Sequence, residues 1–206
     1  MAHQSDPRFL VLHALRVKGF AKLDVVTELT ALPADAVGDQ LSTLQADELV
    51  QFREARELWQ LTPSGRVAHA EALAEDVADD GLRSALQQPY AGFLELNEVF
   101  KELCGEWQLR DGVPNDHSDG AYDAAVITRL ADIDAKAQPT CSSFAAVMDR
   151  FATYAPRLRV AIEKVQGGNQ QQFTGVMCNS YHDVWMELHE DLILTLGIDR
   201  AKEGSF

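Results

Sequence analysis

Apolar side chains recur at helical spacing along most of this chain and form short continuous runs in only one stretch. Val37, Leu41 and Leu44 fall at i, i+4 and i+7, the spacing of one buried helical stripe. Together with two earlier apolar patterns, they predict three helices, over about residues 7–18, 24–31 and 33–47. Two apolar runs then predict strands at 49–53 and 57–61, joined through Glu54-Ala55-Arg56 as the tip of a hairpin.

Helix start and stop signals agree with these boundaries. Asp6 and Pro7 open the first helix, Gly19 ends it, and we expect Asp24 to cap the second helix. Thr62 can cap a fourth helix that runs to about residue 79, and proline at its first position lacks only an N–H that would have had no partner there.

The pattern after residue 80 is helical throughout. Asp79-Asp80-Gly81 is the expected break between two regions, and Pro89 is expected to kink or divide the helix that follows. Helices are predicted over 82–109, 121–136, 141–152, 156–165 and 180–196, with a long polar loop at 111–120. The chain is therefore predicted to be mainly α, with three helices and a short β-hairpin at residues 1–80 and an all-helical bundle at residues 81–206.

Composition limits the partners of such a chain. It has 206 residues, a net charge of −14 and 46% apolar residues, so a packed core is expected and unspecific nucleic-acid affinity is not. Residues 1–78 carry seven Lys and Arg against twelve Asp and Glu, a charge of −5. A local basic face remains compatible with this balance.

Cysteine usage and hydropathy point to a reduced, cytoplasmic protein. Cys104, Cys141 and Cys178 lie far apart, without the spacing of a zinc cluster, and are expected to act as small buried hydrophobic residues. No apolar run approaches the ~20 residues of a membrane span, so we expect no membrane partner. No charged start followed by an apolar run opens the chain, so we expect no signal peptide.

Three short motifs follow one another between residues 41 and 66. They are Leu41-x-x-Leu44, the turn Asp47-Glu48-Leu49-Val50, and the run Leu61-Thr62-Pro63-Ser64-Gly65-Arg66. With these motifs, residues 7 to about 78 resemble the winged helix-turn-helix domain of bacterial transcription regulators of the MarR type and, more loosely, of the PadR type. The resemblance covers just over a third of the chain. It implies that the third helix enters the DNA major groove, and the PadR type implies a homodimer formed through the C-terminal helices.

The resemblance also implies which residues would contact a double-stranded DNA operator. On the outward side of the third helix, the side chains suited to base edges are Gln40, Ser42, Thr43 and Gln45. The cations suited to phosphates are Lys18, Lys22, Arg53, Arg56 and Arg66. Asp35 and Asp39 would face phosphates and therefore oppose DNA binding. The fold that the resemblance implies favours DNA binding, whereas these charges do not.

Histidines raise a separate question about the second region. His182 and His189 lie seven residues apart on one helical face, about 10.5 Å along the axis, and His117 of the polar loop could fold onto them. These residues could form a mixed metal or effector site, or could simply hydrogen-bond inside the bundle. The loop does not fit a calcium-binding EF-hand, because Val126 stands where that motif needs a glutamate.

Two main hypotheses and a weaker third one follow. The first is a cytoplasmic, dimeric transcription regulator whose C-terminal helices dimerise and sense an effector. The alternative is an acidic winged helix that no longer binds DNA and docks a protein partner. No catalytic motif stands out, so we expect a protein that is not an enzyme and has no resident cofactor. A metal-dependent enzyme built on His117, His182 and His189 is the third possibility.

Overall fold

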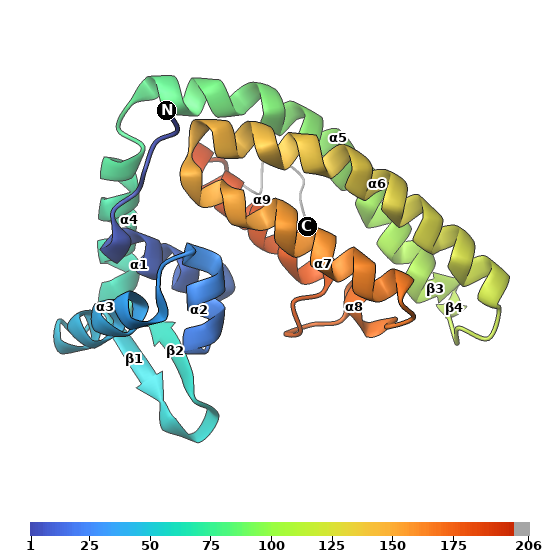
Figure 1. Ribbon diagram of the computed structural model, residues 1–206, viewed down its shortest axis with the longest axis horizontal. Coiled ribbons are helices and arrows are strands. Elements are labelled where there is room, and N and C mark those ends of the chain that lie inside the picture. The colour runs from blue at the N-terminus through green and yellow to red at the C-terminus, as the bar shows by residue number, and fades with distance from the viewer. Residues whose placement is uncertain (200–206) are drawn as a thin grey trace.

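The first 62 residues form three helices followed by a two-stranded antiparallel hairpin (Figure 1). The structure is a computed structural model and describes residues 1–199. The elements of this part are α1 (Pro7–Lys18), α2 (Leu23–Thr30), α3 (Ala34–Ala46), β1 (Val50–Arg53), the 3₁₀ turn η1 (Glu54–Arg56) and β2 (Leu58–Leu61). A fourth helix, α4 (Pro63–Asp76), then leads away from the hairpin.

Local chemistry explains most of these boundaries. The Asp6 carboxylate accepts a hydrogen bond from the Arg8 amide at 2.8 Å, and Gly19 ends α1 at a φ of +81°. The expected Asp24 cap is wrong. The helix α2 begins at Leu23, so Lys22 occupies the N-cap position and Asp24 lies within the first turn. The Lys22 side chain forms no capping hydrogen bond.

The hairpin is fixed at both of its ends. Val50 pairs with Leu61 and Arg53 pairs with Leu58, while Ala21 adds an isolated bridge to Trp59. Thr62 then caps α4 as predicted, because its hydroxyl oxygen accepts from the Gly65 amide at 2.9 Å.

The second region is built on four long helices that pack in a ring. They are α5 (Asp80–Gln108), α6 (Gly120–Val147), α7 (Tyr154–Gln166) and α9 (Tyr181–Leu196), and α9 returns to pack on α5. Between them lie a 3₁₀ segment, η2 (Asp149–Thr153), and a four-residue helix, α8 (Gln171–Thr174), neither of which was predicted. Figure 1 shows α5 and α6 running side by side along the whole region.

Pro89 does not divide α5, so of the two expected outcomes only a kink stays a prediction. Two other predictions for this region are wrong. The helices expected at 121–136 and 141–152 are one helix through Pro139, because packing of α5 along α6 outweighs the backbone hydrogen bond lost at a proline. The region is also not all-helical. Asp111 and Gly112, with φ of +53° and +80°, form a tight turn, so that β3 (Leu109–Arg110) pairs with β4 (Val113–Pro114).

Two separate hydrophobic clusters form the core of the described residues. The smaller joins α1, α2, α3 and the hairpin, and includes the predicted stripe of Val37, Leu41 and Leu44, each fully buried. The larger fills the four-helix region but also takes Phe9 from α1 and Val77 after α4. The turn between α4 and α5 falls at the predicted break, yet apolar packing crosses it, and the division at residue 80 stays a prediction.

The cysteines differ from one another in exposure. Cys104 and Cys141 are buried as expected, and burial raises the pKa of each thiol to about 12. Cys178 is only half-buried, which corrects the expectation for that residue. Within residues 1–199, no helix has the length and apolar character required to cross a lipid bilayer.

Candidate functional site

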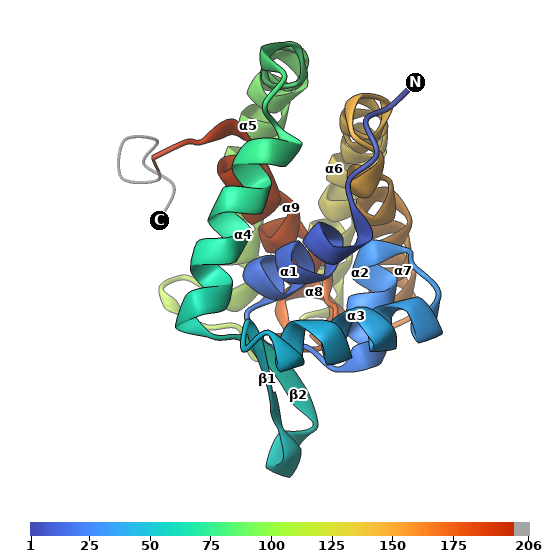
Figure 2. The same ribbon diagram turned by 90° about the vertical axis from the view of Figure 1, so that its left-hand side faces the viewer.

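The solvent-facing side of α3 carries the side chains predicted to meet base edges. Ser42, Thr43 and Gln45 are exposed and Gln40 is half-buried. The Ser42 and Thr43 hydroxyls donate to the carbonyls of Gly38 and Asp39 four residues earlier, at 2.8 and 2.9 Å. Both hydroxyl oxygens therefore keep their lone pairs for an external donor. Figure 2 shows α3 on the outside of the molecule, directly beside the hairpin.

Three arginines around α3 have no ionic partner. Arg53, Arg56 and Arg66 are exposed, and none of them forms an ion pair or hydrogen bond with its side chain within residues 1–199. Arg53 ends β1, Arg56 lies in the η1 turn at the hairpin tip, and Arg66 lies in the first turn of α4. The predicted phosphate donors at the hairpin and at the start of α4 are thus available to an external anion.

The other two predicted cations form ion pairs with side chains of the same chain. Lys22 Nζ lies 3.5 Å from Glu57 Oε2 in an exposed and therefore weak pair. Lys18 is not available, because its ammonium group is half-enclosed between the Glu187 carboxylate and the Asn179 side chain. This pairing opposes a contact between Lys18 and phosphate, which stays a prediction.

Acidic side chains also remain on α3. Asp35 and Asp39 are exposed, and neither has a cationic partner in the described part of the chain. Asp47, which follows α3, is paired with Arg8 at 2.7 Å. Glu48, after α3, and Glu54, at the hairpin tip, are exposed and unpaired as well. Within residues 1–199 the face therefore combines three free guanidinium groups with four free carboxylates.

Behind this face, α1 is tied to α9 by three successive ion pairs. His13 Nε2 lies 2.9 Å from Asp191 Oδ1, and Arg16 Nη1 lies 2.8 Å from Glu190 Oε1. The third pair joins Lys18 to Glu187. Because one partner of each pair comes from each region, these contacts hold the N-terminal helices against the bundle.

Arg150 of η2 lies at the centre of this buried junction. Its guanidinium lies 3.3 Å from Asp191, donates to Asp76 of α4 at 2.8 Å and donates to the Thr195 hydroxyl at 2.6 Å. The Tyr154 hydroxyl donates to Asp191 at 3.0 Å. Four elements distant in sequence therefore share one network of buried charges.

The electrostatics of the junction follow from its burial and its cations. Burial alone would raise the pKa of Asp191, but His13 and Arg150 outweigh it and hold that pKa well below its usual range. Burial, followed by the electrostatic effect of His13 and Arg16, lowers the pKa of His69 to about 3. His69 is therefore neutral near pH 7 and hydrogen-bonds His13 at 3.0 Å.

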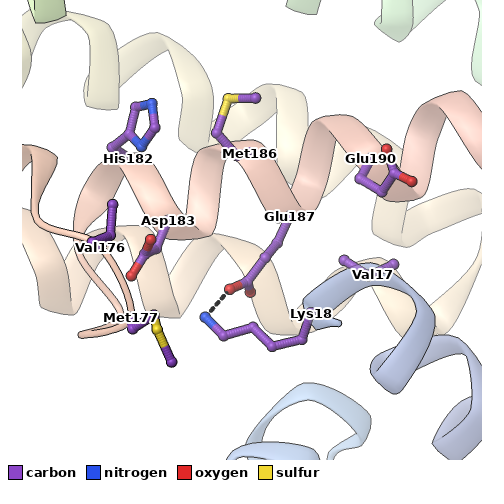
Figure 3. Close-up of a pocket in the computed structure, with 9 residues that line it drawn as sticks. All are labelled: Val17, Lys18, Val176, Met177, His182, Asp183, Met186, Glu187 and Glu190. Atoms are coloured by element: carbon purple, nitrogen blue, oxygen red, sulfur yellow. Dashed lines mark hydrogen bonds and ion pairs between the residues drawn. The ribbon is translucent and has the colours of Figure 1, made fainter. Parts of the chain in front are cut away.

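A groove of about 320 Å³ opens beside the ion pairs of α1 and α9 (Figure 3). His182 and Met186 of α9 project together on one side, and Lys18 reaches Glu187 on the other. Met177, on the segment before α9, forms a further part of the wall. Burial lowers the pKa of His182, which keeps this imidazole neutral near pH 7. The groove can therefore accept apolar groups, while its charged side chains are satisfied within the protein.

The three histidines singled out in the sequence have separate neighbours. His117 Nδ1 lies 3.0 Å from Asp123 Oδ2, and its ring lies on Trp107. His182 contacts the ring of Phe100, and His189 is buried against aromatic rings of α5. Within residues 1–199, no three His, Cys, Asp or Glu side chains come together as a metal site would require. The predicted grouping of these histidines has no support in their contacts.

The buried junction has no counterpart among the residues predicted from the sequence. Its members are charged or histidine residues within otherwise apolar helical stripes, such as His13 between Leu12 and Ala14 and Asp191 before Leu192. Buried charged groups need partners, so these positions were a usable signal, although the pairing itself could not be read from spacing.

Comparison with models of known families, with curated proteins and with solved structures finds no match to this chain.

Proposed function

We propose that this protein is a DNA-binding transcription regulator, with α1–α3, the β1–β2 hairpin and the start of α4 acting as a winged helix-turn-helix. The observation that carries the proposal is the set of three exposed, unpaired arginines on the hairpin and α4, beside the polar face of α3. In this arrangement α3 lies in the major groove, and Arg53 and Arg56 reach the backbone or the minor groove.

The net charge of −14 shapes the expected binding. Asp35 and Asp39 repel phosphates, so binding to random sequence is weak and specific binding depends on base contacts from Gln40, Ser42, Thr43 and Gln45. A homodimer through the C-terminal helices would double the number of arginines on an operator, which would offset part of the repulsion.

Capture of genomic DNA by the purified full-length protein, at low and moderate salt, tests this function. We expect a few enriched sites whose affinity falls steeply with salt. In Arg53→Gln and Arg56→Gln, loss of one phosphate contact each should reduce the slope of log K against log salt by ~0.9 per contact. Arg8→Gln is the matched control, because Arg8 is paired with Asp47 and should leave the slope unchanged. Absence of enriched DNA at both salt concentrations would refute the proposal.

The alternative function, docking of a protein partner by an acidic winged helix, is favoured by one observation. Asp35 and Asp39 are exposed on α3 without cationic partners in the described part of the chain. Asp35→Lys and Asp39→Lys separate the two functions. A DNA-binding α3 should tolerate these changes or bind DNA more tightly, whereas an acidic docking face should lose its partner.

A further inference from the structure

The side of α3 that lies opposite its buried stripe carries acidic and hydroxyl side chains. Asp35, Asp39 and Ser42 fall at i, i+4 and i+7, which places them on one helical face, and all three are exposed. Thr43 is exposed beside them, one turn after Asp39, whereas Gln40 is half-buried. Because α3 lies on the outside of the molecule (Figure 2), a major groove that receives this face meets Asp39 near its centre.

The side chains at the centre of this face can accept hydrogen bonds but cannot donate them. The Ser42 and Thr43 hydroxyls already donate to the Gly38 and Asp39 carbonyls, which commits their only hydrogens to the backbone of α3. The carboxylates of Asp35 and Asp39 are acceptors only, and α3 contains no Lys or Arg. The centre of the face therefore offers lone pairs without an N–H or O–H group beside them.

The four bases differ in how well they suit such a face. In the major groove, only the N4 amino group of cytosine and the N6 amino group of adenine are donors, whereas guanine and thymine present oxygen or nitrogen acceptors. An acceptor placed against another acceptor loses its water without gaining a hydrogen bond. Adenine also presents its N7 acceptor beside the amino group, which a carboxylate cannot satisfy. A carboxylate on this face therefore fits cytosine best.

We propose that α3 selects operator DNA by accepting hydrogen bonds from base amino groups, with Asp39 accepting from the N4 amino group of a cytosine. The Ser42 and Thr43 oxygens accept from amino groups of neighbouring bases in the same way. This inference rests on the proposed function and names the base that the same face reads. Asp35 lies ~6 Å from Asp39 along the helix axis. That distance is close to two base-pair steps of ~3.4 Å, so a second cytosine is expected about two base pairs away.

Asp39 then acts on DNA in two separate ways. Its charge repels phosphates whatever the sequence, whereas its oxygen distinguishes one base from another. The repulsion lowers the affinity for DNA that offers no amino group at this position, which widens the difference between operator and random sequence. Asp39→Lys should still bind DNA at least as tightly overall, but at other sequences, because a lysine donates to guanine.

Selection of binding sites from a random DNA library by the full-length protein tests the inference. Asp39→Asn keeps the shape of the side chain but adds an amide donor, which suits the adjacent N6 donor and N7 acceptor of adenine. We expect the parent to select a C·G pair and Asp39→Asn to select an A·T pair at the same position. The control is Glu71→Gln, which removes one exposed negative charge from α4 and should keep the C·G pair.

Affinity for the selected site measures the contact directly. N4-methylcytosine still pairs with guanine but places a methyl group where the cytosine hydrogen faced the groove. In place of the selected cytosine, it should weaken binding of the parent by ~10-fold, the usual size of one base contact. Asp39→Ala has no acceptor at this position, so the methyl group should change its affinity by less than about twofold.

The outcomes separate this inference from the proposed function. Selected sites without a C·G pair, or the same preferred base for the parent and Asp39→Asn, would overturn the inference and leave DNA binding intact. An equal effect of the methyl group on the parent and Asp39→Ala would also overturn the contact with Asp39. Absence of any selected DNA for the parent would refute the proposed function itself, and the inference with it.

Discussion

The His13 imidazole lies 2.9 Å from the Asp191 carboxylate, with both side chains at most 5% exposed. This pair joins α1 to α9, the first and last helices of residues 1–199. Asp191 also faces Arg150, which in turn binds Asp76 at the end of α4. One buried carboxylate therefore holds together the two regions that the sequence separates near residue 80.

Replacement of Asp191 by asparagine should strongly destabilise the protein. Asn has nearly the same shape but leaves the buried charge of Arg150 without one of its two carboxylates, and breaking a buried pair in this way costs ~3–5 kcal/mol. Urea unfolding followed by circular dichroism measures the change. The control is Asp132→Asn on the exposed side of α6, which should stay within ~0.5 kcal/mol of the parent. Equal stability of the two variants would contradict the role of Asp191.

Stability should fall as the pH drops below about 6.5, because of His69. Its pKa is lowered to about 3 in the folded protein, against about 6.5 when unfolded. Between these values the unfolded chain binds a proton that the folded chain does not, so acid favours unfolding by at most ~1.4 kcal/mol per pH unit. The lowered pKa of Asp191 adds a further loss below pH 3.8.

His69→Gln isolates this contribution. Glutamine can still hydrogen-bond His13 but does not titrate, so the dependence of the free energy of unfolding on pH should become shallower between pH 6.5 and 5. Urea titrations at four pH values in that range give the slope for each protein. Identical slopes would show that His69 is not held neutral by its surroundings.

The helices of the first region could be predicted because their signals are local. Asp6, Gly19 and Thr62 act on amides or turns within three residues of themselves, and the stripe on α3 follows from a 3.6-residue period. The error at Pro139 has a different origin. A proline's cost is local, whereas the packing of α5 on α6 that offsets it comes from residues tens of positions away.

The candidate sites also include features that follow from local sequence and features that depend on contacts between distant residues. Exposure of Ser42, Thr43 and Gln45 follows from the apolar stripe on the opposite side of α3, and was predictable. The ion pair between Lys18 and Glu187 depends on contacts between α1 and α9. The burial of Arg157 Nη1 without a hydrogen-bond partner within residues 1–199 depends on contacts that α7 makes with other elements. Glu187 lies 169 positions from Lys18 and 30 positions from Arg157, and no spacing rule for one sequence contains such contacts.

Asn97 and Trp185 should show strong coupling in a double-mutant cycle. The Trp185 indole donates to the Asn97 amide oxygen at 2.9 Å, and both side chains are at least 98% buried. Trp185→Phe leaves the amide oxygen without its donor, at a cost of ~1–3 kcal/mol beyond the lost packing. Asn97→Leu together with Trp185→Phe removes both polar partners, so its loss of stability should be smaller than the sum of the single losses. Strict additivity in chemical denaturation would show that this hydrogen bond contributes nothing.

Two glycine-to-alanine changes in helices should have opposite effects. A Cβ atom on Gly65 would lie 1.9 Å from the Leu49 carbonyl oxygen, so Gly65→Ala must push α4 away from the start of the hairpin. Gly92 is also helical but has nothing within 4 Å of its Cβ position, and Gly92→Ala should stabilise α5 by up to ~1 kcal/mol. Thermal unfolding should therefore give Gly65→Ala a Tm well below that of the parent and Gly92→Ala a Tm slightly above it.

Because α4 and the hairpin also position Arg66 and Arg53, Gly65→Ala should in addition weaken any DNA binding, while Gly92→Ala should leave it unchanged. A Gly65→Ala protein as stable as the parent would mean that α4 does not approach Leu49 this closely.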